Sequence, residues 1–127
     1  MASSQKLNIG VVGLGRMGQR HALNVLHRIP RVRLRSVCSV AAHGIQWANE
    51  RLAIEGVKVF DQFEEMIAAP GLDAVIIFSP TALHIQHTLA AVDNKIHVLC
   101  EKPVTTDLAQ AILAVVCHLS MICNMFS

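Results

Sequence analysis

A chain of 127 residues has the size of one domain and is long enough to bury a hydrophobic core. Because 53% of the residues are hydrophobic and only 16% are charged, the composition excludes a disordered or coiled-coil protein. A net charge of +2 argues against nucleic-acid binding; four arginines cluster between residues 28 and 35, but no aromatic residues interleave them.

The cysteines and the apolar segments bear on the compartment. The four cysteines show no C-x-x-C spacing and the N-terminus has no signal-peptide pattern, so we expect a reducing, cytoplasmic location. The most apolar stretch, residues 108–126, is interrupted by Gln110, His118, Ser120 and Asn124 and has no positive flank after it. We therefore expect no membrane span there.

Along the chain, short apolar runs alternate with longer amphipathic ones, which is the pattern of βαβ units. This pattern predicts strands at residues 7–12, 32–39, 57–60, 74–78 and 97–100. It predicts helices at residues 17–29, 44–54, 61–69 and 81–92, with Asp61 as the N-cap of the third. Right-handed crossovers then give a single α/β domain with a doubly wound parallel sheet of strand order 3-2-1-4-5. In such a sheet, ligands bind beyond the carboxyl ends of the strands, where the winding reverses between the first and fourth strands.

The first loop at that edge, VVGLGRMGQRH, carries three glycines in the spacing G-x-G-x-x-G, directly after a strand and at the start of a helix. Glycines here permit a tight turn, let the backbone approach a pyrophosphate and leave free N–H groups facing it. The alternative is a glycine-rich turn that binds no ligand. Arg16 either reaches a phosphate or is solvated. The cofactor-binding residues expected from this loop are Gly13, Leu14, Gly15, Arg16, Met17 and Gly18.

Ser39 ends the second predicted strand, at the position where an NAD-selective site carries Asp or Glu to bind the ribose hydroxyls. A serine removes the negative charge that would repel a 2′-phosphate, and His43 together with Arg16 adds weak positive character. We therefore expect NADP or NAD as the cofactor, with NADP slightly favoured. No arginine directly follows Ser39, which keeps NAD open.

The loop after the fourth strand, FSPTALH, lies across the switch point from the glycines. Ser79 can donate or accept a hydrogen bond, and Pro80 rigidifies the turn so that its neighbours line the cofactor. Alternatively, Ser79 and Pro80 simply start a helix. His84 either faces the site or, with His87, belongs to a polar helix face. No third ligand accompanies the two histidines, so we expect no metal site.

Glu101 and Lys102 follow the fifth strand, near the expected position of the nicotinamide end of a cofactor. An ammonium there can polarise or protonate a substrate oxygen during hydride transfer, while Glu101 tunes its position and charge. The alternative is a surface ion pair. Lys102 is thus the candidate catalytic residue, and both residues are candidates for cofactor binding.

Three stretches together, GLGRMG after the first strand, SPTALH after the fourth and CEKPVTTDL after the fifth, resemble the amino-terminal domain of the Gfo/Idh/MocA oxidoreductases. The resemblance runs from about Lys6 to Gln110, and EKP is its most specific motif. It implies an NAD(P)-binding Rossmann domain, followed in the family by a larger α/β domain that closes over a sugar, cyclitol or related substrate. It also implies that Lys102 helps to bind and polarise the substrate and that Pro103 sets the turn, often as a cis peptide.

The sequence departs from that family after residue 110. We expect residues 1–110 to form the NAD(P)-binding domain and residues 111–127 to form an atypical apolar tail, with the family's substrate domain and its catalytic Asp and His absent. A shortened or altered gene product, such as an intron that is read through, is a hypothesis for this tail. A normal in-frame continuation downstream of Gln110 in the genome would remove that hypothesis.

These residues are compatible with three functions. The first is the cofactor-binding part of an oxidoreductase that transfers hydride to or from a CH–OH group of a sugar or cyclitol, without turnover by the isolated chain, since donor and acceptor must be held in contact. The second is a non-catalytic dinucleotide sensor, or an interaction subunit that self-associates or binds a protein partner through its apolar tail. The third is a nucleotide-binding methyltransferase, against which Ser39 and the EKP turn both count.

Overall fold

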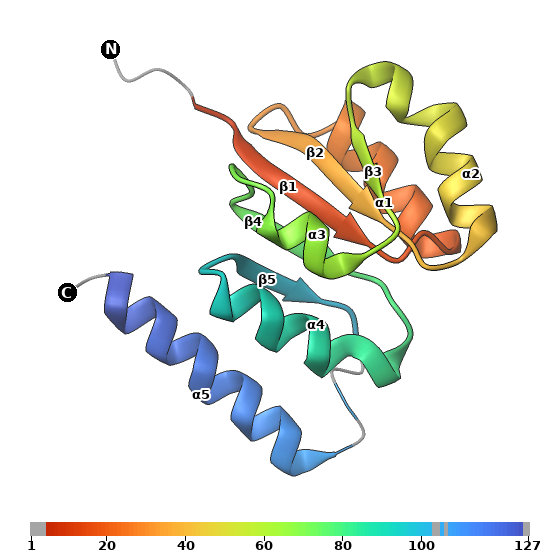
Figure 1. Cartoon of the computed structure of the whole chain (residues 1–127). Coiled ribbons are helices and arrows are strands. Elements are labelled where there is room, and N and C mark those ends of the chain that lie inside the picture. The colour runs from red at the N-terminus through yellow and green to blue at the C-terminus, as the bar shows by residue number, and fades with distance from the viewer. Residues whose placement is uncertain (1–4, 103–104, 106, 126–127) are drawn as a thin grey trace.

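The computed structural model describes residues 5–102, 105 and 107–125, with side chains up to residue 116 (Figure 1). Five parallel strands form one sheet in the order β3-β2-β1-β4-β5, which confirms the predicted doubly wound α/β fold. The strands are β1 (Leu7–Val12), β2 (Val32–Cys38), β3 (Lys58–Phe60), β4 (Ala74–Ile77) and β5 (His97–Cys100). The helices are α1 (Arg16–His27), α2 (Ala42–Arg51), the short 3-10 helix η1 (Ala53–Glu55), α3 (Phe63–Ala68), α4 (Thr81–Asp93) and α5 (Leu108–Met125).

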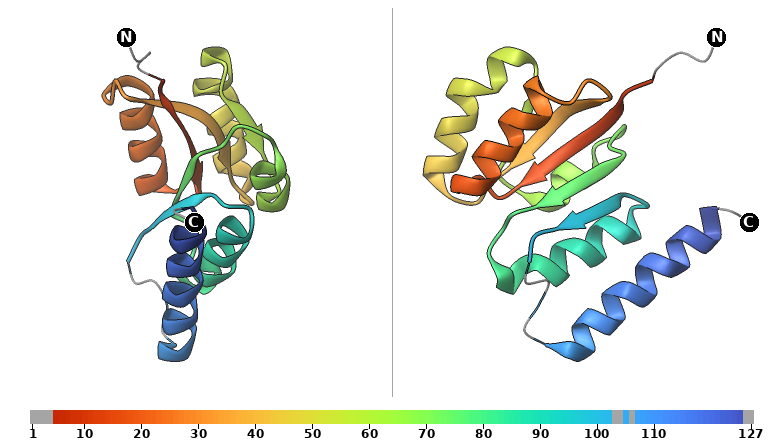
Figure 2. Two further views of the ribbon diagram at one scale, coloured as in Figure 1. Left: turned by 90° about the vertical axis from the view of Figure 1, so that its left-hand side faces the viewer. Right: turned by 180° about the vertical axis from the view of Figure 1, so that it is seen from behind.

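Helices cover both sides of the sheet, and each side has its own apolar core (Figure 2). Helices α1 and α2 pack on one side, where Val11 and Val37 are fully buried. Helices α3 and α4 pack on the other side, against Val75 and Ile77. Strands buried on both faces have no polar face to present, which is why β1 and β4 appear in the sequence as continuous apolar runs.

The strand register brings the carboxyl ends of four strands level with one another. Val12 of β1 pairs with Cys38 of β2 and with Ile77 of β4, and Ile77 pairs in turn with Cys100 of β5. The residue that follows each of these strands therefore lies on one rim of the sheet. The predicted site loops all leave the sheet from this rim.

Three local features differ from, or lie beyond, the sequence-based expectation. The Asp61 N-cap is wrong: α3 begins at Phe63, and Gln62 occupies the N-cap position without a side-chain cap. Phe63 is buried in the second core, so its packing sets the start of this short helix. Helix α5 spans residue 110, the predicted end of the NAD(P)-binding domain, and lies beside α4 (Figures 1 and 2). The division of the chain at residue 110 stays a prediction. Pro103, to which the resemblance assigns a turn, lies outside the described residues.

Candidate functional site

The three glycines of the first loop, Gly13, Gly15 and Gly18, have different structural roles. Gly13 has φ +91°, and a Cβ there would overlap the backbone of Phe78 and Ser79, so this glycine lets the loops after β1 and β4 touch. A Cβ on Gly18 would overlap the carbonyl of Gly13, so the third glycine lets α1 start directly against the loop. A Cβ on Gly15 would meet nothing within 4 Å. The space in front of Gly15 is therefore open, as close approach of a ligand to the backbone requires.

The N-terminus of α1 opens onto that space. Gly15 is the N-cap, and no side chain caps this end of the helix. The first N–H groups of an α-helix have no partner within the helix, and the helix dipole adds positive character to them. Gln19 instead donates from Nε2 to the carbonyl of Leu14 at 3.1 Å, which holds the loop in place. An uncapped helix end beside open space is suited to an anionic group such as a pyrophosphate.

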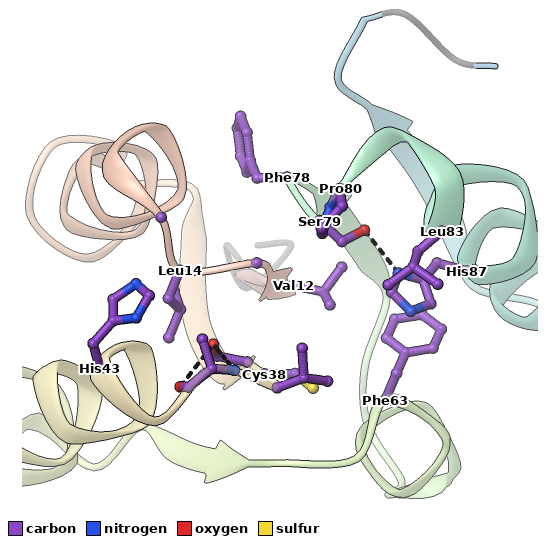
Figure 3. A pocket seen from close by; sticks show the side chains of 15 residues that line it. Val12, Leu14, Cys38, His43, Phe63, Phe78, Ser79, Pro80, Leu83 and His87 are labelled. Atoms are coloured by element: carbon purple, nitrogen blue, oxygen red, sulfur yellow. Dashed lines mark hydrogen bonds between the residues drawn. The ribbon is translucent and has the colours of Figure 1, made fainter. Parts of the chain in front are cut away.

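A cavity of about 340 Å³ lies beside this loop, between the ends of β1, β2 and β4 (Figure 3). Six of the predicted cofactor-binding residues line it: Gly13, Leu14, Gly15, Ser39, Ser79 and Pro80. The lining is mostly apolar, with a few polar groups converging on it, as is usual for a small-molecule site. The other lining residues are Val12, Cys38, Val40, Ala41, His43, Phe63, Phe78, Leu83 and His87.

Ser39 is buried beneath the rim of the cavity, and its hydroxyl is engaged within its own loop. Its Oγ accepts a hydrogen bond from the N–H of Ala41 at 3.2 Å and lies 3.3 Å from the Ala41 carbonyl. Such a local side-chain-to-backbone bond stabilises the turn into α2. His43, in the first turn of α2, lines the same part of the cavity and is exposed (Figure 3). This corner of the cavity therefore carries no carboxylate and one titratable imidazole.

Ser79 is held by two histidines from α4. Its hydroxyl lies 2.8 Å from Nδ1 of His87, and its carbonyl lies 2.6 Å from Nε2 of His84. His84 and His87 are only 2% and 6% exposed, so the expectation of a polar helix face is wrong. The ring of His87 stacks on Phe63, with centroids 4.2 Å apart. Only His87 of the two histidines lines the cavity; His84 reaches it through Ser79.

Two buried groups near the cavity have shifted pKa values. Burial lowers the pKa of His87 below its ordinary value; the Glu64 carboxylate opposes this shift and the His84 ring adds to it. Burial also raises the pKa of the Cys38 thiol to about 12, and the carboxylates of Glu64 and Asp61 act in the same direction. At neutral pH His87 is therefore an uncharged imidazole and Cys38 an unreactive thiol.

Glu101 and Lys102 line a second hollow, of about 310 Å³, on the same rim. Glu101 Oε1 accepts a hydrogen bond from the backbone N–H of Lys102 at 3.0 Å, while the Lys102 side chain is exposed. Phe78 lines both this hollow and the larger cavity, so the two adjoin. His21 of α1 also lines the second hollow and stacks on Phe78, with centroids 4.7 Å apart.

The structure thus divides the predicted site residues into three groups. Six line the larger cavity, Glu101 and Lys102 line the adjoining hollow, and four lie outside both linings. These four are Arg16, Met17, Gly18 and His84. Among the residues of the two linings, three were not predicted as site residues from the sequence although they make ring contacts there: Phe63, Phe78 and His21. Two of them could have been predicted from their positions in the sequence. Phe78 directly follows the fourth strand, and His21 lies one turn beyond Gly18.

One known protein family and several solved structures match this chain. The family profile for an oxidoreductase family with an NAD-binding Rossmann fold, GFO_IDH_MocA, matches residues 7–118. The chain belongs to the Gfo/Idh/MocA oxidoreductases. Within this family, a myo-inositol 2-dehydrogenase from Thermotoga maritima is 37% identical over 103 residues, which are 81% of this chain and 30% of that protein.

Solved structures of related proteins have the same fold. A scyllo-inositol dehydrogenase from Lactobacillus casei, crystallised with NAD(H) and scyllo-inositol, aligns with a TM-score of 0.85 and 33% identity over 93% of this chain and 34% of that one. A variant of a 3-ketoreductase from Actinomadura kijaniata, crystallised with NADP, aligns with a TM-score of 0.80 and 26% identity over 92% of this chain and 35% of that one. The chain spans about a third of the length of the relatives it matches. It corresponds to the NAD-binding domain of the Gfo/Idh/MocA oxidoreductases.

Two further observations concern the described residues alone. No helix among them is both long and apolar enough to cross a membrane. No three of their His, Cys, Asp or Glu side chains are grouped so that they could hold a metal ion.

Proposed function

We propose that this chain binds an NAD(P) dinucleotide across the rim of the sheet and serves an oxidoreductase that moves hydride to or from a CH–OH group of a sugar or cyclitol. The observation that carries the proposal is the open space in front of Gly15, at the uncapped N-terminus of α1. A nicotinamide cofactor, when bound, supplies the hydride chemistry. The substrate class rests on the relatives, several of which are inositol dehydrogenases.

In this proposal the pyrophosphate is held by the loop from Gly13 to Gly18, with Arg16 and Met17 contributing their N–H groups from the first helical turn. Leu14, Ser79 and Pro80 line the path of the cofactor. His84 donates a hydrogen bond to the Ser79 carbonyl and so positions Ser79. The nicotinamide end then lies toward the second hollow, which adjoins the larger cavity at Phe78.

Lys102 is the residue that we propose to act on the substrate. Its side chain is exposed at the second hollow, where an ammonium can donate a proton or a hydrogen bond to a substrate oxygen. Glu101 orders the Lys102 backbone through its hydrogen bond to the N–H group. For these 127 residues alone we expect binding without turnover, because hydride transfer needs a site that holds the substrate and excludes water, whereas Lys102 is exposed.

For the choice of cofactor we propose that NADP is accepted alongside NAD and is slightly preferred. The corner at Ser39 carries no carboxylate to repel a 2′-phosphate. The N-terminus of α2 begins beside it, with Ala41 as an N-cap that provides no side-chain cap, and His43 lies in its first turn. Both features favour an anionic group at this corner.

Fluorescence titration of the purified chain with NADH and NADPH tests the proposed binding. We expect saturable binding, and we expect Gly15→Ala to weaken it at least about tenfold, or about 1.4 kcal/mol, because the added methyl group enters the space of the pyrophosphate. Since a Cβ at Gly15 meets nothing within 4 Å, the variant should fold as the original chain does.

Gly56→Ala is the matched control for that titration. Gly56 lies in the αL conformation at φ +84° with open space around it, after η1 and away from the cavity lining. Alanine there costs stability through backbone strain, of roughly 1 kcal/mol, without touching the site. We expect Gly56→Ala to keep its affinity for the dinucleotide. Absence of binding by the original chain, or equal affinity of the Gly15→Ala variant, would contradict the proposed function.

A second candidate function is association with another protein through α5, and one observation favours it. Five apolar side chains at the start of this helix are at least half exposed: Leu108, Ile112, Leu113, Val115 and Val116. Residues 108–127 contain no Asp, Glu, Lys or Arg that would oppose the approach of an apolar surface. An exposed apolar face of this kind is typical of an interaction surface. This function is compatible with dinucleotide binding, because the described side chains of α5, up to residue 116, line neither the cavity nor the adjoining hollow.

A further inference from the structure

His87 is a buried, titratable group in the wall of the cavity to which the proposed chemistry gives no role. It projects from α4 between the ring of Phe63 and the hydroxyl of Ser79, as Figure 3 shows. It is 6% exposed, and the 2.8 Å contact with Ser79 is made by Nδ1. A second histidine, His84, holds the other polar group of the same serine.

The hydrogen bond between His84 and the Ser79 carbonyl can have only one direction. A carbonyl oxygen only accepts hydrogen bonds, so the Nε2 atom of His84, 2.6 Å from the Ser79 carbonyl, carries a hydrogen and donates it. The Ser79 hydroxyl is different, because it has one hydrogen to donate and two lone pairs with which to accept. Its role toward the cavity therefore depends on the protonation of His87 Nδ1.

The surroundings of His87 favour an uncharged ring. Burial is the main cause of its lowered pKa, and the His84 ring on the same helix adds to the effect. The Glu64 carboxylate on α3 acts in the opposite direction and is outweighed. The buried Cys38 thiol of β2, whose pKa is raised to about 12, remains neutral at physiological pH. Phe63 contributes an apolar ring face.

We propose that His87 is a positioning residue: its neutral Nδ1 accepts the Ser79 hydroxyl hydrogen, so that Ser79 offers only oxygen lone pairs to a ligand in the cavity. When His87 gains a proton, Nδ1 becomes a donor and the Ser79 hydroxyl hydrogen turns away from it. Ser79 then changes from an acceptor to a donor toward the cavity. The consequence for dinucleotide affinity rests on the proposed function; the Ser79–His87 arrangement does not.

The sign of the pH effect follows from desolvation, because the proposed function places the anionic pyrophosphate at the loop from Gly13 to Gly18 and not at His87. A ligand in the cavity displaces water from the surroundings of His87, and removing water from an imidazolium costs more than removing it from a neutral ring. Binding therefore favours neutral His87. The affinity should fall as the pH drops through the pKa of His87, by up to about tenfold per pH unit for a single linked proton.

The first experiment needs no ligand. Nitrogen-15 NMR of the histidine rings in the full chain distinguishes a protonated from an unprotonated Nδ1, and His87→Asn assigns the resonance. We expect His87 to be the tautomer with hydrogen on Nε2 at neutral pH and to titrate below an ordinary histidine. A hydrogen on Nδ1 at neutral pH would overturn the proposal.

The second experiment measures NADH affinity from about pH 7.5 to about pH 5.5 for the original chain and for His87→Asn. Asparagine places an amide near the position of Nδ1 but does not titrate, and other histidines such as His43 are common to both chains. We expect the affinity of the original chain to fall several-fold more than that of the variant. Superimposable pH profiles, or tighter binding of the original chain at acid pH, would overturn the proposal. If neither chain binds NADH or NADPH at any pH, the proposed function fails, and the tautomer alone decides the role of His87.

Discussion

At the scale of single residues, the position after β2 decides the chemistry of one corner of the cavity. Ser39 stands where a carboxylate would bind ribose hydroxyls, and its hydroxyl is already bonded to the N–H of Ala41. It therefore contributes a stable turn instead of a charge. We therefore expect the choice between NAD and NADP at this corner to depend on His43 and on the N-terminus of α2.

Ser39→Asp should reverse the preference between the two cofactors. An aspartate can keep the bond to the Ala41 N–H while adding a negative charge that repels a 2′-phosphate and accepts ribose hydroxyls. We expect the ratio of NADPH affinity to NADH affinity to fall at least about tenfold, or about 1.4 kcal/mol, in equilibrium titrations. Ser39→Asn, which has the same shape without the charge, is the control. An unchanged ratio in Ser39→Asp would place the 2′-phosphate elsewhere.

At the scale of elements, strand order and strand ends followed from the sequence, whereas the contacts of α4 did not. Continuous apolar runs and the glycine spacing specify β1, β4 and the loop between β1 and α1 almost locally. The two histidines of α4 appeared to form a polar face, because a helical pattern does not reveal how a helix is rotated against its sheet. In the structure that rotation buries His84, Ile85, His87 and Thr88 together. The stack of His21 on Phe78 joins α1 to the loop after β4 and likewise depends on tertiary packing.

The exposed apolar side chains of helix α5 predict self-association of the chain. Ile112 and Val115 are 56% and 59% exposed, on a helix that lies beside α4 (Figure 1), and we expect a second copy of the chain to cover them. We expect concentration-dependent self-association in sedimentation velocity, and we expect Ile112→Lys to reduce it. Since the side chain is already exposed, the free energy of unfolding should change by no more than about 0.5 kcal/mol.

Gln110→Lys adds the same charge at an exposed polar position of the same helix and is the control for that experiment. It should leave the association largely unchanged. If the chain sediments as a monomer at every concentration, the predicted self-association is wrong. If the two lysine substitutions reduce the association equally, added charge is the cause and the apolar face is not.

At the scale of the whole molecule, the buried histidine links folding to pH. The folded-state pKa of His87 is lowered from an ordinary value of 6.5, so the unfolded chain binds more protons between the two pKa values. With respect to His87 alone, the free energy of unfolding is therefore unaffected above about pH 6.5 and falls as the pH drops toward the folded-state pKa, by up to about 1.4 kcal/mol for each unit between the two. Urea unfolding of the original chain and of His87→Asn at several pH values measures this contribution. Parallel stability curves would mean that His87 contributes nothing to the acid sensitivity.

The loops after β1, β4 and β5 meet on one rim of the sheet, and we propose that a dinucleotide lies across them. Amide chemical-shift changes during titration with NADPH locate the bound dinucleotide on the chain. We expect the largest changes at Gly13 to Gly18, at Ser79 and at Glu101 and Lys102, with smaller changes near Ser39. Changes concentrated at the opposite rim, around Arg31, Asp73 and Lys95, or no changes at saturating cofactor, would contradict it.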